Sequence, residues 1–163
     1  MKTLLIVWYS FTGGSRQLAE AARDGALEAG GVEVGYLAAE VARPADLLSA
    51  DGFIFVCPEN LSAIAGVMKA FFDRTYYDVL GQIEGRPYAA MICAGSDGAN
   101  AQRQLERIAT GWRLKRVAET RIVNVGAQTK EEILAAKEIG ETELAAAREL
   151  GATLAAGIEM GVF

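Results

Sequence analysis

The chain begins with the stretch LLIVWYSFTGGSRQLAE, residues 4–20, in which an apolar run passes through a short polar loop into an amphipathic segment. The apolar run, residues 2–9, is continuous in Leu, Ile and Val, which is typical of a strand buried on both faces of a parallel sheet. Over residues 15–29 apolar residues recur near helical spacing, and Gly30-Gly31 then favours a helix end. The opening therefore predicts a strand, a glycine-containing loop and a helix.

The same alternation continues to the end of the chain. Further apolar runs predict strands at residues 32–37, 52–57, 88–94 and 121–125, and amphipathic stretches predict helices at residues 45–49, 62–77, 100–112 and from about 130 onward. Such alternation favours a parallel sheet with helices on both faces, connected by right-handed crossovers. We expect a three-layer, doubly wound α/β fold with five strands in the order 2-1-3-4-5. The length of 163 residues and the absence of a linker-like tract predict a single domain over residues 1–163.

Composition excludes several classes of partner. The net charge of −5 argues against nucleic acid or an anionic membrane as the main partner. The longest apolar runs are far shorter than the roughly 20 residues that a membrane-spanning helix needs. Only Lys2 precedes the first apolar run and no small-residue cleavage pattern follows it, so no secretory signal is predicted. We expect a cytoplasmic protein that does not insert into membranes.

The chain contains no histidine, which excludes Ser-His-Asp and Cys-His nucleophile systems. Cys57 and Cys93 are too far apart for a CxxC motif, and neither is followed six positions later by arginine, as a phosphotyrosine-phosphatase nucleophile requires. Their apolar surroundings favour buried structural thiols. We therefore predict no catalytic side chain and no metal site, so any chemistry must come from a bound group.

The loop after the first strand has the groups that a phosphate binds. It consists of Ser10, Phe11, Thr12, Gly13, Gly14 and Ser15, and it leads directly into the first helix. Three hydroxyls, two glycines and the free amides of a helix N-terminus make a concave set of donors for an anion. The alternative is that Ser15 or Thr12 merely caps the helix. No GxxxxGK[ST] or GxGxxG motif is present, and the first and third strands do not end in the acidic residues of a response-regulator receiver.

Ser10, Thr12, Gly13 and Ser15 match the pattern [ST]-x-T-G-x-[ST], and the chain resembles the flavodoxin-like FMN proteins over nearly its whole length. The resemblance implies that this loop binds the FMN phosphate. The second loop, Pro58-Glu59-Asn60-Leu61-Ser62, is similar to the Pro-Glu-Tyr-Asn-Gly-Ser segment of NAD(P)H-dependent FMN reductases, and more loosely to WrbA-type quinone reductases. It lacks the aromatic residue and the glycine of that segment. Asn60 and Ser62 would bond the flavin ring or cap a helix, and Glu59 is either a ring contact or a solvated carboxylate.

The third loop, Ala94-Gly95-Ser96-Asp97-Gly98, follows the fourth predicted strand. In the family that the chain resembles, this loop wraps the pyrimidine edge of the flavin. Its small residues allow the backbone to approach the ring closely, so that amides donate to the ring oxygens. Asp97 is alternatively a helix cap or a turn former.

Two functions fit this interpretation. Flavodoxin carriers usually cover the flavin with aromatic residues, whereas residues 58–66 and 94–100 contain no Trp, Tyr or Phe. An uncovered ring leaves room for nicotinamide, which favours an NAD(P)H oxidoreductase that passes electrons through FMN to a small acceptor such as a quinone or free flavin. The alternative is a flavodoxin-type electron carrier between protein partners. A weaker third interpretation is an interaction module that has lost its cofactor.

Further expectations concern the oligomeric state, three aromatic residues and a basic segment. The reductases that the chain resembles commonly form dimers or tetramers, so we expect a homo-oligomer in which a neighbour supplies the missing aromatic. Two interpretations apply to the aromatic residues Tyr76, Tyr77 and Trp112. They line an acceptor pocket, or they belong to the core or to a subunit interface. A basic segment either receives the extra phosphate of NADPH or forms a solvated helix face; it comprises Arg103, Arg107, Arg113, Lys115, Arg116 and Arg121.

Overall fold

The computed structural model describes all of residues 1–163. The strands are β1 (Thr3–Trp8), β2 (Glu33–Ala38), β3 (Gly52–Asn60), β4 (Ala63–Ile64), β5 (Pro87–Ala94), β6 (Lys115–Arg116) and β7 (Arg121–Asn124). The helices are α1 (Gly14–Ala29), α2 (Pro44–Ser49), α3 (Gly66–Val79), α4 (Ala99–Gly111), α5 (Lys130–Leu134) and α6 (Glu141–Met160).

The sheet has the predicted order. Strands β2, β1, β3 and β5 lie side by side and parallel, and β7 pairs in parallel with the far edge of β5. Because β5 and β7 are the fourth and fifth predicted strands, the order 2-1-3-4-5 is confirmed. Two short strands were not predicted: β6, which pairs with the start of β5, and β4, which runs antiparallel to the end of β3.

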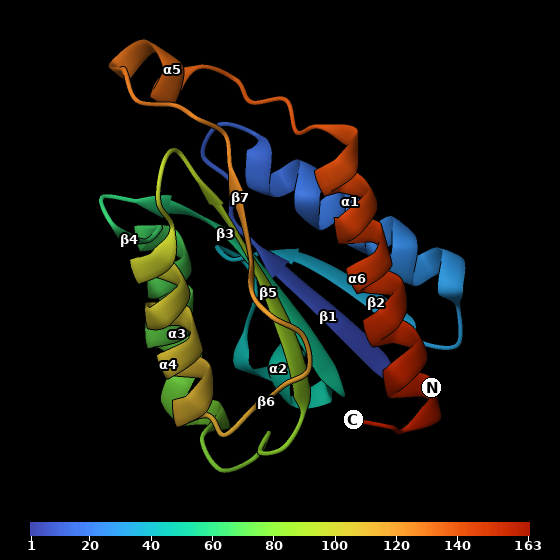
Figure 1. Ribbon diagram of the computed structural model, residues 1–163. Helices are drawn as coiled ribbons and strands as arrows, with labels where there is room; N and C mark the ends of the chain where they lie inside the picture. Colours follow the sequence, from blue (N-terminus) through green and yellow to red (C-terminus); the bar gives the residue numbers. More distant parts are fainter.

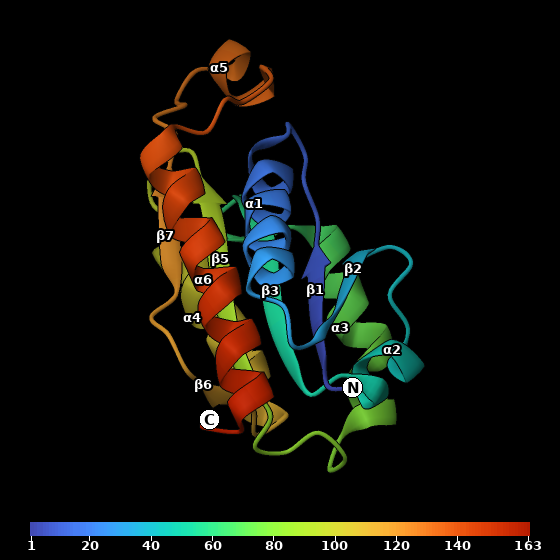
Figure 2. The ribbon, with the colours of Figure 1, turned by 90° about the vertical axis from the view of Figure 1, so that its right-hand side faces the viewer.

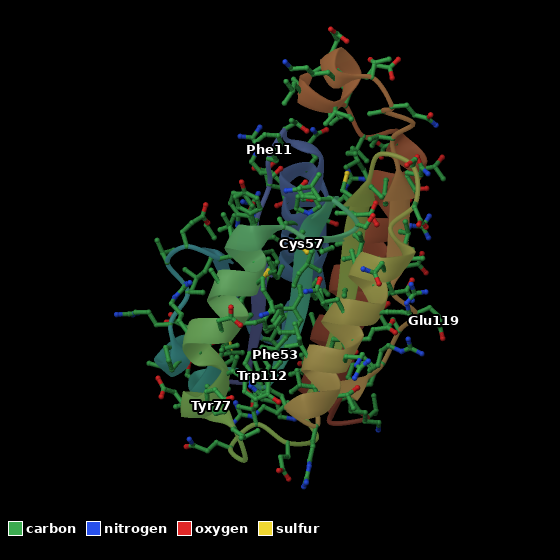
Figure 3. All side chains as sticks on the ribbon, turned by 90° about the vertical axis from the view of Figure 1, so that its left-hand side faces the viewer. Phe11, Phe53, Cys57, Tyr77, Trp112 and Glu119 are labelled. Carbon is green, nitrogen blue, oxygen red and sulfur yellow. The ribbon has the colours of Figure 1, made fainter.

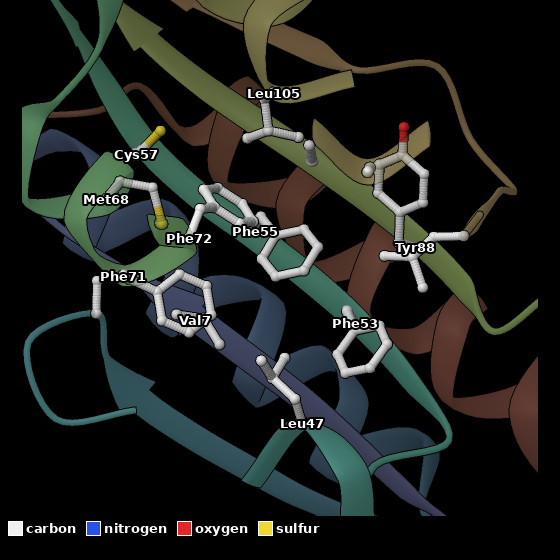
Figure 4. Packing of buried hydrophobic residues seen from close by; sticks show 14 of the residues in the cluster. Val7, Leu47, Phe53, Phe55, Cys57, Met68, Phe71, Phe72, Tyr88 and Leu105 are labelled. Carbon is white, nitrogen blue, oxygen red and sulfur yellow. The ribbon is translucent and has the colours of Figure 1, made fainter. Parts of the chain in front are cut away.

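Helices cover both faces of the sheet, as expected. Helices α1 and α6 lie on one face, and α2, α3 and α4 lie on the other (Figures 1 and 2). Side chains of β3 alternate between the two cores, because successive residues of a strand point to opposite faces. Phe53 and Phe55 join the core under α2, α3 and α4, whereas Ile54 and Val56 join the core under α1 and α6. Figure 4 shows Phe55 packed beside Phe72, with ring centroids 5.4 Å apart.

Two predicted helices differ from the structure. The helix expected over residues 62–77 begins only at Gly66, because the chain first turns back at Leu61 and Ser62 to form the β3–β4 hairpin. The long helix expected from residue 130 is divided into α5 and α6. A capping box at Thr129 begins α5, and the chain is extended again before Gly140, the N-cap of α6.

Helices α1 and α6 approach each other closely through small residues. A Cβ atom added to Gly25 would lie 2.0 Å from the carbonyl oxygen of Arg148, and one added to Gly151 would lie 1.9 Å from that of Ala22. Only glycine permits this separation, because any side chain would overlap the backbone of the other helix. The crossing holds α1, and with it the loop that precedes α1, in a fixed position over the sheet.

The loops at the carboxyl ends of β1, β3 and β5 gather at one end of the molecule, and α5 lies over the same end (Figure 1). This is the edge where doubly wound sheets bind ligands. None of the helices is both long enough and apolar enough to cross a membrane.

Candidate cofactor site

The first loop, residues 10–15, presents unpaired hydrogen-bond donors at the start of α1. Gly13 adopts φ 100 and donates its amide to Ser10 Oγ at 3.0 Å, which curls the loop. The amides of Gly14, Ser15 and Arg16 have no acceptor in the protein, and no side chain caps the helix. Ser15 is 1% exposed and its hydroxyl also has no partner. Unpaired buried polar groups are rare and unfavourable, so this donor set fits a bound phosphate better than a simple helix cap.

A segment that we call the strap, residues 128–140, is fastened to this loop. The amide of Lys137 donates to the carbonyl of Thr12 at 2.9 Å. The side-chain amide of Gln17 donates to the carbonyl of Lys137 at 2.7 Å, and its oxygen accepts from the amide of Ile139 at 3.0 Å. Lys137 Nζ donates to the carbonyls of α5, which closes the end of that short helix. The strap thus forms a wall of the site, and Gln17 is its main attachment.

The second loop is a β-hairpin. Glu59 pairs with Ile64 and Asn60 with Ala63, so Leu61 and Ser62 form its two-residue turn. The carboxylate of Glu59 accepts from the amide of Gly98 at 2.8 Å. The structure therefore shows a third role for Glu59, distinct from both interpretations offered for it: it joins the second loop to the third.

The third loop approaches its neighbours through small residues. A Cβ atom at Gly95 would lie 2.7 Å from the carbonyl oxygen of Ala127, just before the strap. Gly98 adopts a positive φ of 92°, which favours glycine. The carboxylate of Asp97 accepts from the amide of Ala99 at 3.2 Å and is exposed to solvent. Gly98 is the N-cap of α4 and no side chain caps that helix, so the i-to-i+2 hydrogen bond of Asp97 agrees with the turn-former interpretation.

The three loops and the strap enclose two adjoining cavities, of about 60 Å³ and about 420 Å³. Residues shared by both cavities are Phe11, Glu59, Asn60, Gly95, Ala127 and Ile133. The inner, smaller cavity is completed by Thr12, Pro58, Cys93, Ala94, Val125 and Lys137, and the outer one by Leu61 and Ser96. Together the cavities have the size and the mixed apolar and polar lining of a small-molecule site.

The remaining predicted residues lie around these cavities. A separate groove of about 460 Å³ is lined by Ser10, Gly13 and Arg16. Phe11 and Thr12 border both this groove and the inner cavity. Gly14 and Ser15, which begin α1, are buried. Ser62, Asp97 and Gly98 support the loops and are absent from the cavity walls.

Sequence reasoning missed five wall residues: Cys93, Val125, Ala127, Ile133 and Lys137. It considered only three loops, although the carboxyl end of the last strand reaches the same edge of the sheet. One motif in the sequence could have revealed these residues, the capping box Thr129-x-x-Glu132. In it the side chain of each residue accepts a hydrogen bond from the backbone amide of the other. That motif marks a separate short helix and hence a folded segment over the site.

Both cysteines are buried and free, as predicted. Burial raises the pKa of Cys57 to about 12 and that of Cys93 to about 11. Their thiols are therefore protonated at neutral pH, and a protonated thiol is a poor nucleophile. Cys93 lies directly under the first loop, since a Cβ atom at Gly14 would be 2.7 Å from its sulfur.

Tyr76 and Tyr77 of α3 and Trp112, the C-cap of α4, lie away from the site. Trp112 is fully buried and donates its indole N–H to the carbonyl of Tyr76 at 3.0 Å, so it belongs to the core. Figure 3 shows Tyr77 and Trp112 at the opposite end of the molecule from Phe11. The interpretation of these residues as an acceptor-pocket lining is therefore wrong.

The basic segment does not form one anion-binding patch. Arg113 pairs with Glu84 at 3.5 Å, Arg116 with Glu106 at 2.7 Å, and Arg121 with Glu143 at 2.7 Å. These pairings favour the solvated-surface interpretation. Arg103 donates to the side chain of Asn100 at 3.3 Å, and no residue of the basic segment borders either cavity.

The sheet order and this arrangement of loops define a flavodoxin-like fold. A flavodoxin from the domain Archaea superposes with a TM-score of 0.78 over 96% of this chain and 98% of its own, at 17% identity. A WrbA-like protein from Agrobacterium tumefaciens superposes with a TM-score of 0.67 over 98% and 99% of the two chains, at 18% identity. At such identities the likeness shows the fold alone.

The sequence comparisons show the family. A model of the NADPH-dependent FMN reductase family matches residues 44–130, and the chain belongs to this family of FMN flavoproteins. It is 32% identical over 98 residues to a flavodoxin of Aquifex aeolicus, covering 60% of this chain and 53% of that protein. It is 33% identical over 100 residues to an NAD(P)H dehydrogenase (quinone) of Archaeoglobus fulgidus, covering 46% and 52% of the two chains. The chain thus spans about half the length of these relatives.

Proposed function

We propose that residues 1–163 act as one FMN-binding domain of an NAD(P)H oxidoreductase. The electrons of reduced nicotinamide would pass through FMN to a small acceptor, such as a quinone or free flavin. Membership of the FMN reductase family and the relative named NAD(P)H dehydrogenase (quinone) support this proposal. The observation that carries it is the meeting of three loops and the strap around one site, beside a helix N-terminus with unpaired amides and an unpaired buried hydroxyl.

Each part of the site has a distinct role in the proposal. The free amides of Gly14, Ser15 and Arg16, with the hydroxyls of Ser10, Thr12 and Ser15, would hold the phosphate. The second and third loops would flank the flavin ring, with their spacing set by the Glu59–Gly98 hydrogen bond. Bound FMN supplies the hydride chemistry that no side chain of this histidine-free chain offers. The protein's own contribution is binding, orientation and the exclusion of water.

The lining of the cavity supports access by nicotinamide. No Trp, Tyr or Phe of the second or third loop borders either cavity, and the only aromatic wall residue is Phe11, which is 56% exposed. An uncovered ring face permits a second planar ring to stack at the short distance that hydride transfer needs. Pro58, Val125 and Ala127 add apolar surface to the wall of the inner cavity.

The proposal is tested by cofactor binding and by nicotinamide oxidation. FMN is titrated into the protein and followed by quenching of flavin fluorescence, and oxidation of NADH and of NADPH is followed with menadione or riboflavin as acceptor. Thr12→Glu places a carboxylate against the phosphate position and should weaken FMN binding at least a hundredfold. Thr153→Glu, on the exposed side of α6, is the matched control. Unchanged FMN affinity in Thr12→Glu would refute the assignment of the loop.

The second candidate is an electron carrier between proteins, which the relative named flavodoxin favours. A carrier would bind FMN equally well but would not oxidise either nicotinamide with any small acceptor. It would accept electrons from dithionite in two well-separated one-electron steps. Anaerobic titration of the FMN-loaded protein therefore separates the two candidates.

We also propose that the protein forms a homodimer or tetramer in which a neighbour contributes an aromatic side chain beside the flavin. The open outer cavity, bordered by only one aromatic residue, supports this proposal. Light scattering after gel filtration measures the assembly directly, and a strictly monomeric species with full activity would contradict it.

A further inference from the structure

Helix α5 is held in place by hydrogen bonds rather than by a core of its own. None of its residues is buried, and residues 128–136 are all exposed to solvent. Figures 1 and 2 show α5 standing off the end of the sheet, joined to the rest of the protein by two loops. A short helix without a buried face gains little from the hydrophobic effect, so its position depends on the few contacts at its ends.

The helix is nevertheless a preformed unit. The capping box of Thr129 and Glu132 closes its start. The Lys137 ammonium group closes its end, because it donates to the carbonyls of Glu132 and Ile133 at 2.7 Å and 3.0 Å. Both ends of α5 are therefore satisfied within the strap, and the helix does not need the rest of the protein to complete its hydrogen bonds.

Glycines lie on either side of this unit. Gly126 adopts φ 66, and a Cβ atom at Gly126 or at Gly140 would meet nothing within 4 Å. Glycine permits a wide range of backbone angles, and no neighbouring atom obstructs rotation at these two positions. The segment between them can therefore swing as one body once its attachments to the first loop are released.

Gln17 makes most of those attachments. Its side-chain amide group donates to the carbonyl of Gly13 at 2.9 Å and to that of Lys137 at 2.7 Å, and its oxygen accepts from the amide of Ile139 at 3.0 Å. One side chain thus joins the first loop to a segment 120 positions away. The amide of Lys137 adds a direct bond to the carbonyl of Thr12. We call Gln17 the latch.

Strap residues border every hollow of the candidate site. Ile133 borders both cavities, Lys137 borders the inner one, and Leu134 and Ala136 border the groove beside the first loop. The inner cavity measures about 60 Å³, whereas small-molecule sites usually measure roughly 300–1,000 Å³. A cofactor that extends from the free amides of the first loop into the cavities must pass the strap, because strap residues border the hollows at both ends of that path.

We propose that the strap is a gate for the entry and exit of FMN, and that the latch sets the rate of both steps. The inference rests on the FMN site of the proposed function and goes beyond it, because it assigns the kinetics of cofactor exchange to a segment outside the three loops. The latch is closed before and after FMN binds and open only while FMN passes. Its loss therefore lowers the barrier by the same amount in both directions.

Gln17→Leu tests the gate without disturbing α1, because Leu is a good helix former. Association of FMN is measured by stopped-flow quenching of flavin fluorescence, and dissociation by the recovery of fluorescence after dilution. Both kon and koff should rise about tenfold, equivalent to about 1.4 kcal/mol in each barrier. The Kd for FMN should therefore stay unchanged. Gln82→Leu, which removes a similar side-chain bond to the carbonyl of Asp78 away from the site, is the matched control and should alter neither rate.

A strap that serves only as a wall of the site gives a different result. Loss of the latch would then remove contacts to bound FMN, so koff alone would rise, kon would stay as in the wild type and the Kd would weaken. That pattern would overturn the proposal. Unchanged kon and koff in Gln17→Leu would overturn it equally.

Hydrogen exchange of the FMN-free protein measures the opening without any cofactor. The amide of Lys137 donates to Thr12 and not to Gln17, so it is freed only if the strap opens as a unit. In Gln17→Leu its exchange should quicken about tenfold, together with that of the Ile139 amide. Faster exchange at Ile139 alone would show a local loss of one bond and would overturn the gate.

The gate and the proposed function fail in different ways. If kon and koff rise together in Gln17→Leu but the wild-type protein oxidises neither NADH nor NADPH, the proposed reductase is refuted and the gate stands. If the wild-type protein oxidises NAD(P)H but the exchange of FMN does not depend on Gln17, the gate is refuted and the proposed function stands.

Discussion

Substitution of Gly151 by alanine tests the helix crossing that positions the first loop. The added Cβ atom would lie 1.9 Å from the carbonyl oxygen of Ala22, whereas ordinary van der Waals contact begins at 3.4 Å. Since the obstacle is backbone, α1 and α6 would have to separate by about 1.5 Å. Such a shift would loosen the core that both helices form with the sheet.

The expected loss follows from two opposing terms. Overpacking of a well-packed core costs about 1–3 kcal/mol, and a backbone overlap of this size lies at the upper end of that range. Alanine is a better helix former than glycine by about 1 kcal/mol, which offsets part of the loss. We expect Gly151→Ala to lower the free energy of unfolding by about 2 kcal/mol, a substantial part of the 5–15 kcal/mol typical of a whole domain.

The assay is urea unfolding followed by circular dichroism and by tryptophan fluorescence, since Trp8 and Trp112 lie on opposite faces of the sheet. Gly66→Ala is the control, because Gly66 begins α3 and a Cβ atom there would meet nothing within 4 Å. It should be neutral or slightly stabilising. Gly25→Ala meets the same crossing from α1, so the double variant with Gly151→Ala should lose less than the sum of the two single losses. The reasoning is refuted if Gly151→Ala is as stable as Gly66→Ala.

Three further predictions concern the strap, the thiols and the half-buried Tyr36. Gln17→Leu removes the acceptor of the Ile139 amide and the donor to the Lys137 carbonyl, so the Ile139 amide should exchange with solvent at least tenfold faster in hydrogen-exchange experiments, whereas Gln82→Leu on the far side should change nothing there. Cys57 and Cys93 should resist alkylation at pH 8 in the folded protein, where only about one Cys93 thiol in a thousand is ionised, and should react rapidly in urea; fast labelling of the native protein would contradict their burial. Burial raises the pKa of Tyr36 to about 12, so the folded state favours the protonated phenol; stability should fall as the pH rises from about 10 to about 12, and Tyr36→Phe should reduce that fall.

Much of the candidate site was predictable because its signals are local. The first loop shows hydroxyls, glycines and a helix start within six consecutive residues, and the structure places that loop at the ligand-binding edge. The buried state of both cysteines follows from the apolar runs in which they lie. By contrast, a run of residues that favours a helix, such as residues 62–65, can be held in a hairpin by Gln104 and Asn100 on another element. Tertiary contacts there override local preference.

Local sequence patterns were sufficient to predict the five main strands, the parallel sheet and the nature of the first loop, because periodicity and turn chemistry act over a few neighbouring residues. They did not predict β4, β6 or the division between α5 and α6. Only the tertiary structure decided that the strap borders the site, that Glu59 joins the second loop to the third, and that Leu61, Phe11 and Ile133 share one cavity. These features depend on contacts between residues tens of positions apart, such as Gln17 with Lys137. Such contacts exist only once the sheet has brought the carboxyl ends of its strands together.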